Sequence, residues 1–167
     1  MGTFDILITD ENGAECFSLL NQGKIGYNYG LYDQDKRKLG NVKQHIAFSF
    51  KNRFDVDLNG REIQIVFSHR FKINGEAYCK FTGLDWRTEG DLHHHDYSVL
   101  DGNKVMARVR LTGTVEQDKR DPFKVVANEM NRSLEIECAD DGDAALILAV
   151  VFAIELAEKC DGSRYSG

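Results

Sequence analysis

Eleven consecutive residues near the C-terminus, Ala144–Ile154, carry no polar side chain, whereas the rest of the chain alternates apolar and polar residues. Only Glu155 interrupts this run before Leu156 and Ala157. As a helix, residues 144–157 would extend roughly 21 Å, whereas the hydrocarbon core of a membrane is roughly 30 Å thick. The run therefore predicts an apolar helix that is too short to be transmembrane.

This predicted helix lacks the polar stripe that a helix on the surface of a protein shows. It therefore needs protein around most of its circumference. Asp140, Asp141 and Asp143 precede it, where a side-chain cap and negative charge are both favourable. We expect a central helix over about residues 141–159, followed by a frayed tail over 160–167.

The chain before the helix predicts short strands joined by tight turns, from about residue 4 to residue 138. Turn signals that tolerate a positive φ separate the apolar stretches, at Asn12-Gly13, Asn59-Gly60, Asn74-Gly75 and Asp101–Asn103. The last strands are expected at 123–127 and 134–138, and a long exposed loop at 112–121. Regular hairpins of this kind are typical of an antiparallel sheet that is closed or stacked.

These features together predict the fold class and the domain organisation. We expect a mainly β, single-domain protein over residues 1–167. Its antiparallel β-barrel, closed or nearly closed and of about 11–12 strands, would wrap around the central hydrophobic C-terminal helix. A sheet curved around that helix would cover the whole apolar circumference, and it would leave no interior cavity for a ligand.

Composition excludes several functional classes. The formal net charge of −6 argues against nucleic-acid binding, which depends on neutralising phosphates with Lys and Arg. The first residues lack the basic and apolar segments of a signal peptide, so we expect a cytoplasmic protein that is peripheral at the membrane if it associates with one. The four cysteines are far apart and are expected to be reduced thiols.

No constellation of residues predicts catalysis. The sequence has no Gly-x-Ser-x-Gly elbow, no phosphate-binding glycine-rich loop and no His-Glu-x-x-His pair. We therefore expect a protein that is not an enzyme, with no catalytic residue and no cofactor.

The run His93-His94-His95 is the stronger of two candidates for metal chemistry; the other, Asp55-Val-Asp-Leu-Asn-Gly60, matches only the first half of a calcium loop, because Val66 stands where the bidentate glutamate is required. In a strand, His93 and His95 would share a face and supply half of a metal site. A site needs further converging ligands, and the sequence does not place His45 or His69 near them. A polar hairpin end explains the run more simply, so we predict no metal site.

Several motifs in a fixed order resemble the LURP-one-related family of the tubby C-terminal-like superfamily, which is related to the phospholipid scramblases. They are Val56-Asp-Leu-Asn-Gly-Arg-Glu-Ile63, Gly83-Leu-Asp-Trp-Arg-Thr-Glu-Gly-Asp91, Asp96-Tyr-Ser-Val-Leu-Asp-Gly102, Val105-Met-Ala107 and the terminal apolar helix. The resemblance covers about residues 4–158. It implies a barrel of twelve strands around a central helix, in agreement with the fold expected from the residues themselves.

The chain departs from the family pattern in two places. It lacks the basic, aromatic strand with which family members commonly begin, so one barrel edge is expected to be open to a partner strand. After Leu111, a longer charged segment without tryptophan replaces a tryptophan-rich strand that is frequent in the family.

The resemblance implies a binding function rather than a reaction, because tubby domains bind phosphoinositide headgroups. Anionic membrane lipid headgroups are therefore the expected partner, and the candidate residues are Lys36, Arg37, Lys38, Arg108 and Arg110. The alternative is a protein-interaction or scaffold domain with a protein partner at the open barrel edge or at the 112–131 loop.

Overall fold

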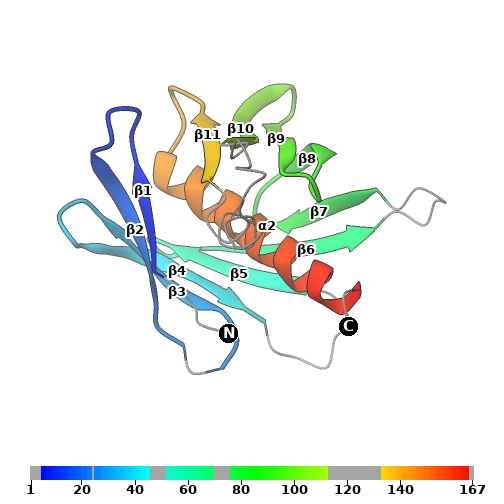
Figure 1. Cartoon of the computed structure of the whole chain (residues 1–167), viewed down its shortest axis with the longest axis horizontal. Coiled ribbons are helices and arrows are strands. Elements are labelled where there is room, and N and C mark those ends of the chain that lie inside the picture. Colours follow the sequence, from blue (N-terminus) through cyan, green and yellow to red (C-terminus); the bar gives the residue numbers. More distant parts are fainter. Residues whose placement is uncertain (1–4, 24, 46–51, 70–75, 113–132, 166–167) are drawn as a thin grey trace, which may run out of the picture.

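Two antiparallel sheets and one C-terminal helix make up the part of the chain that the computed structural model describes, residues 5–23, 25–45, 52–69, 76–112 and 133–165 (Figure 1). The first sheet has seven strands in chain order: β1 (Ile6–Thr9), β2 (Glu15–Asn21), β3 (Asn28–Asp33), β4 (Lys38–Gln44), β5 (Asn52–Leu58), β6 (Arg61–His69) and β7 (Ala77–Thr82). The second sheet has four: β8 (Trp86–Asp91), β9 (Asp96–Asp101), β10 (Lys104–Thr112) and β11 (Ser133–Cys138). The helix is α2 (Ala144–Tyr165).

Tight turns give both sheets their simple up-and-down order. Asn59 and Gly60 have φ values of 51° and 81°, as a type I′ hairpin turn between β5 and β6 requires. Hairpins also form at the predicted turns around Gly13 and Gly102. The predicted turn at Asn74-Gly75 lies outside the described residues, as do the predicted strand 123–127 and almost all of the 112–131 loop.

The alternation of residues along the strands decides which face of the large sheet is buried. In β5, Phe54, Val56 and Leu58 are buried, and their neighbours Asp55 and Asp57 point to the other face. Strands β4, β5 and β6 contact α2 from one side, and β10 and β11 contact it from the other. Side chains from both sheets and the helix form one hydrophobic core.

Helix α2 is buried around its circumference, as its composition predicts. Every residue from Leu146 to Val151 is buried, and so are Ala153, Ile154, Leu156 and Ala157. In Figure 1 the helix crosses the space between the two sheets. Asp143 caps its start, because the Oδ1 atom of Asp143 accepts a hydrogen bond of 3.2 Å from the backbone N–H of Leu146.

The helix continues beyond its predicted end near residue 159. It runs through Tyr165, so residues 160–165 are helical rather than frayed. A glycine inside a helix, here Gly162, costs about 1 kcal/mol relative to alanine, which favours an earlier end. Tertiary contacts oppose that preference, because Asp161 is buried and hydrogen-bonded to His69 of β6.

The two sheets are not joined to each other by backbone pairing within the described residues. Strands β7 and β8 contact each other, and the backbone N–H of Cys79 donates a hydrogen bond of 3.1 Å to Oγ1 of Thr88. At the other side, β1 and β11 are the outermost strands of their sheets. The mainly β architecture with a C-terminal helix is therefore confirmed, and closure into a barrel stays a prediction.

The enclosure of α2 makes the helix intolerant of charge. We expect Leu148→Asp, which places a carboxylate at a buried position, to destabilise the fold by more than about 4 kcal/mol and to abolish soluble expression. Ala144→Asp is the matched control, because Ala144 is exposed in the first helical turn, where a negative charge is favourable. Expression and thermal unfolding by circular dichroism measure both. A Leu148→Asp protein as stable as the control would contradict the enclosed-helix architecture.

Candidate functional site

The first candidate surface is the basic turn, Lys36, Arg37 and Lys38, where the chain passes from β3 into β4, with Lys38 as the first residue of β4. Lys36 and Arg37 are well exposed, with side-chain exposures of 63% and 74%. Each cation has a polar partner: Lys36 with Glu15 (2.5 Å), Arg37 with Asp33 (3.2 Å) and Asp35 (2.9 Å), and Lys38 with Oε1 of Gln22 (3.1 Å). Two of the three cations, Lys36 and Arg37, are thus already paired with carboxylates, whereas Lys38 contacts a neutral amide.

The other headgroup candidates lie on the second sheet. Arg108 of β10 donates hydrogen bonds to Oγ of Ser98 (3.3 Å) and to the carboxylate of Asp96. Arg108 and Arg110 stand opposite Glu137 and Glu135 in the pairing of β10 with β11. No described contact joins these arginines to the basic turn, so the structure does not bring the five candidates together.

The second candidate surface is a histidine–acid cluster where the C-terminal half of α2 leaves the core. Glu155, Glu158 and Asp161 are three residues apart, so they share one face of the helix. Each contacts a histidine through a ring nitrogen: Glu155 with His95 (Nδ1–Oε2, 2.6 Å), Glu158 with His93 (Nδ1–Oε1, 3.5 Å) and Asp161 with His69 (Nε2–Oδ2, 2.7 Å).

The histidines come from two places that are distant in sequence. His69 is the last residue of β6, whereas His93 and His95 lie in the turn between β8 and β9. His95 has a φ of 54° and donates its backbone N–H to the carbonyl of Leu92. The predicted hairpin end is therefore confirmed. His93 and His95 do not share the face of a strand but contact successive acids of the helix.

The innermost part of the cluster is a hydrogen-bonded network around Glu155. The Tyr97 hydroxyl donates a hydrogen bond of 2.7 Å to Oε1 of Glu155, while His95 contacts the other carboxylate oxygen. Tyr97 is completely buried, and its pKa is raised well above 10, first by burial and then by the nearby Glu155 carboxylate. Glu155, the residue that interrupts the apolar run, thus has a partner for each oxygen.

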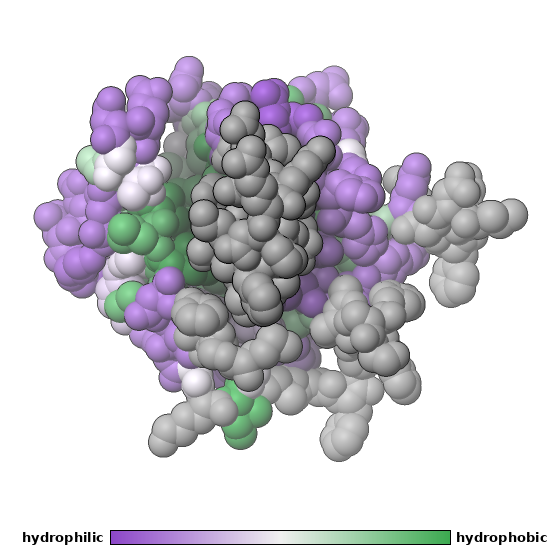
Figure 2. Space-filling view, viewed as in Figure 1, coloured by the Kyte–Doolittle hydropathy of each residue, from purple (hydrophilic) through white to green (hydrophobic). Residues whose placement is uncertain are grey.

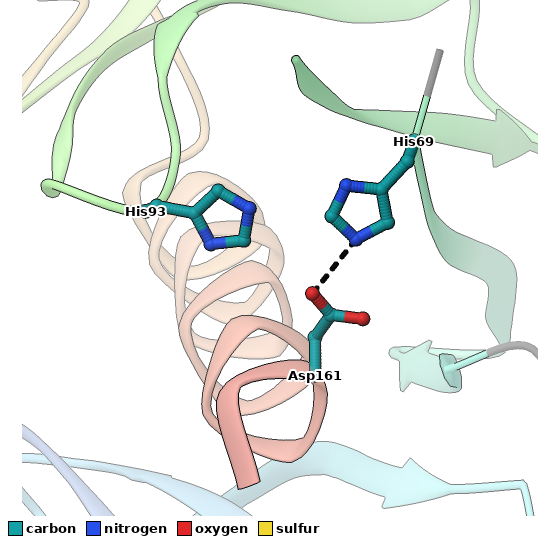
Figure 3. A group of neighbouring side chains, drawn as sticks. All are labelled: His69, His93 and Asp161. Carbon is teal, nitrogen blue, oxygen red and sulfur yellow. Dashed lines mark hydrogen bonds and ion pairs between the residues drawn. The ribbon is translucent and has the colours of Figure 1, made fainter. Parts of the chain in front are cut away.

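The outer part of the cluster brings together His69, His93 and Asp161 (Figure 3). The two imidazole rings are stacked, with centroids 5.4 Å apart and planes inclined by 18°. Phe67 contacts both rings edge-on, at centroid distances of 5.7 and 5.8 Å. One potential ligand atom from each of the three residues lies within 4.8 Å of the others, which makes the group suitable for a metal ion.

Only part of this cluster is predictable from the sequence. His93 and His95 stand out as a candidate pair, whereas nothing places His69 near them and nothing assigns a role to Glu158 or Asp161. The three-residue spacing of the acids was a usable signal, because it predicts one polar face on a helix. No local pattern marks His69, since only the packing of β6 against α2 brings it to Asp161.

Together, the fold and the cluster define the class of this protein. It is a mainly β protein whose sheets pack around its own C-terminal helix, with the histidine–acid cluster where that helix leaves the core. Comparison with protein-family models matches residues 1–155 to the LURP-one-related family, so the chain belongs to that family. The predicted resemblance is confirmed, and the matched region ends before Glu158 and Asp161. No curated protein and no solved structure matches the chain. None of the helical segments described combines the length and the apolar character needed to span a membrane.

The network at Glu155 leads to a prediction about stability. Tyr97→Phe should lower the free energy of unfolding by about 1–3 kcal/mol, because it removes a donor from a partly buried carboxylate. Tyr32→Phe is the control: its hydroxyl accepts a hydrogen bond from Gln22 near the surface, and its loss should change stability by less than about 0.5 kcal/mol. Urea unfolding measures both variants. If both variants lowered the free energy of unfolding equally, the Tyr97–Glu155 hydrogen bond would stabilise the fold no more than the Gln22–Tyr32 hydrogen bond near the surface.

Proposed function

We propose that this member of the LURP-one-related family is a non-enzymatic binding module that engages anionic phospholipid headgroups at a membrane surface. The observation that supports this function is the basic turn, where three consecutive exposed cations directly follow the Gln34-Asp35 tip of a hairpin and lead into β4. A hairpin tip can approach a flat surface without a change in the core. Each Lys or Arg near an anionic membrane contributes about 1 kcal/mol of attraction.

The carboxylate partners of the basic turn do not prevent this role. Ion pairs between exposed side chains are worth only about 0–1 kcal/mol, so they exchange readily. Asp35 is itself 62% exposed, and Lys36 bridges to Glu15 on a neighbouring strand. A headgroup phosphate offers more charge than a carboxylate and accepts paired hydrogen bonds from arginine. Multiply charged phosphoinositides are therefore the favoured headgroups.

The packing of the interior supports binding at the outer surface rather than catalysis inside the fold. Helix α2 occupies the space in which a barrel would hold a ligand. One hollow on the outer face of the large sheet is lined by polar residues: Asn28, Asn41, Lys43, Asp55 and Asp57. Its two carboxylates outnumber its single lysine, so the hollow is not a headgroup site and the basic turn stays the candidate.

Vesicle sedimentation tests the proposal. The wild-type chain should bind vesicles of phosphatidylcholine with a phosphoinositide at low salt, and binding should weaken as salt screens the charges. The triple variant Lys36→Glu, Arg37→Glu and Lys38→Glu should lose most of this binding. A matched triple charge reversal at Arg61, Lys80 and Lys104 keeps the net charge equal and should retain it. Equal binding by both variants, or none by the wild type, would refute a headgroup site at the turn.

A protein-interaction function is the second candidate, favoured by an observation on β1. This outermost strand of the large sheet carries Leu7, which is 59% exposed. Figure 2 shows a hydrophobic area beside the N-terminal strands on a face that is otherwise mostly hydrophilic. An apolar side chain on an edge strand favours addition of a partner strand.

Self-association provides the test of this edge. If β1 pairs with a second chain, the mass measured by light scattering should rise with concentration, and Leu7→Lys should restore the monomer. Ile25→Lys is the control, because Ile25 is 76% exposed but lies outside any strand. A mass that is constant and monomeric for all three proteins would remove support for strand addition between copies of the chain.

A further inference from the structure

We infer that His69, His93 and Asp161 form a binding site for a divalent first-row transition-metal ion of the Zn²⁺ type. The inference is independent of lipid binding, because it concerns a different surface and uses none of the headgroup candidates. It starts from the convergence of three metal-ligating side chains whose ligand atoms all lie within 4.8 Å of one another.

The distances suit a site that closes onto a metal by small side-chain rotations. Ligand atoms about 2.0–2.2 Å from a tetrahedral Zn²⁺ are separated from each other by roughly 3.4 Å. Nε2 of His69 and Oδ2 of Asp161 are now 2.7 Å apart, so they need to separate slightly. The longest separation in the group is at most 4.8 Å, so it needs to shorten by at most roughly 1.4 Å, about twice the change needed between His69 and Asp161.

The donor set selects the class of metal. Two imidazole nitrogens and one carboxylate oxygen match the ligands of Zn²⁺ and of its first-row neighbours. Ca²⁺ and Mg²⁺ prefer sites made of oxygen atoms alone, so they should bind weakly. Three protein ligands leave at least one coordination position for water or for a group supplied by a partner.

The surroundings of the site have the features that support a metal. Nδ1 of His93 is 3.5 Å from Oε1 of Glu158, so with a metal on Nε2 the His93 ring would direct its Nδ1–H toward this carboxylate. In Figure 3 a ring nitrogen of His93 faces His69. The Phe67 ring packs at a steep angle against both imidazole rings and so restricts their positions.

The burial of Asp161 gives a second, independent reason. Asp161 is only 7% exposed, and no other charged residue among those described is buried to this extent. A buried carboxylate is costly unless a counter-charge and hydrogen bonds compensate it. A divalent cation held jointly with two neutral imidazoles supplies that charge.

A bound metal would connect all three layers of the fold. His69 belongs to the seven-stranded sheet, His93 to the turn between two strands of the second sheet, and Asp161 to α2. Backbone pairing does not join the two sheets within the described residues. Because a ligand that binds only the folded state stabilises it by mass action, the metal should raise the melting temperature.

Titration of the tag-free, full-length chain with Zn²⁺ by calorimetry, with a competing chelator, tests the site. We expect one ion per chain and a melting temperature that rises with Zn²⁺, while Mg²⁺ and Ca²⁺ have no such effect. Co²⁺ should bind at the same stoichiometry and give the visible absorption of a low-symmetry nitrogen–oxygen site.

Neighbouring histidines give a matched pair of variants. His93→Ala should weaken Zn²⁺ binding by about 100-fold or more, because it removes a direct ligand. His94→Ala should leave affinity unchanged, since His94 is 82% exposed and contacts Asp91 instead. Glu158→Gln should cost about 10-fold, as expected for a group that orients a ligand. Because His93 and Glu158 are on the rim of the core, circular dichroism should show both variants folded.

Two results would overturn the inference. The first is a wild-type chain that binds no Zn²⁺ at micromolar concentrations while remaining folded. The second is a loss of affinity in His94→Ala as large as in His93→Ala, which would show that the exposed histidine turn alone captures the ion. In either case the cluster would be a set of histidine–carboxylate pairs only, and the proposed lipid function would be unaffected.

Discussion

The enclosure of α2 is the constraint on which the rest of this structure depends. A helix that is apolar around its circumference has no stable position in water, and it gains its stability only when protein covers every side. The large sheet covers one side through β4, β5 and β6, and the second sheet covers the other through β10 and β11. Because the helix fills the interior, binding groups are confined to the outer surfaces and to the rim where the helix leaves the core.

The histidine–acid cluster follows from the same geometry. Toward its C-terminal end, α2 presents acidic residues on one face at intervals of three residues, still close to the core. Charges in such a position need partners, and the histidines of β6 and of the β8–β9 turn supply them. The cluster thereby connects the two sheets through side chains at a place where their backbones do not pair.

The two candidate surfaces differ in how strongly their charges interact. The ion pairs of the basic turn are exposed to water, which weakens them and leaves the cations able to exchange partners. The pairs of the histidine–acid cluster are largely shielded, since Glu155 and Asp161 are only 13% and 10% exposed at their side chains. Shielding strengthens electrostatic interactions and fixes the geometry of the side chains. This difference supports the two proposals, reversible contact with a charged surface at the turn and a bound ion at the cluster.

The sequence predicts the structure correctly where the signal is local. The length and composition of residues 144–154 determined an enclosed helix, the Asn59-Gly60 turn determined a hairpin, and the alternation in β5 determined its buried face, because each depends on backbone preferences and on burial of nearby side chains. The ordered motifs were enough to identify the family. The end of α2 and the outer cluster were decided only by tertiary structure. His69 and Asp161 are 92 residues apart, and no local preference encodes a contact that forms only when β6 packs against the last turns of the helix.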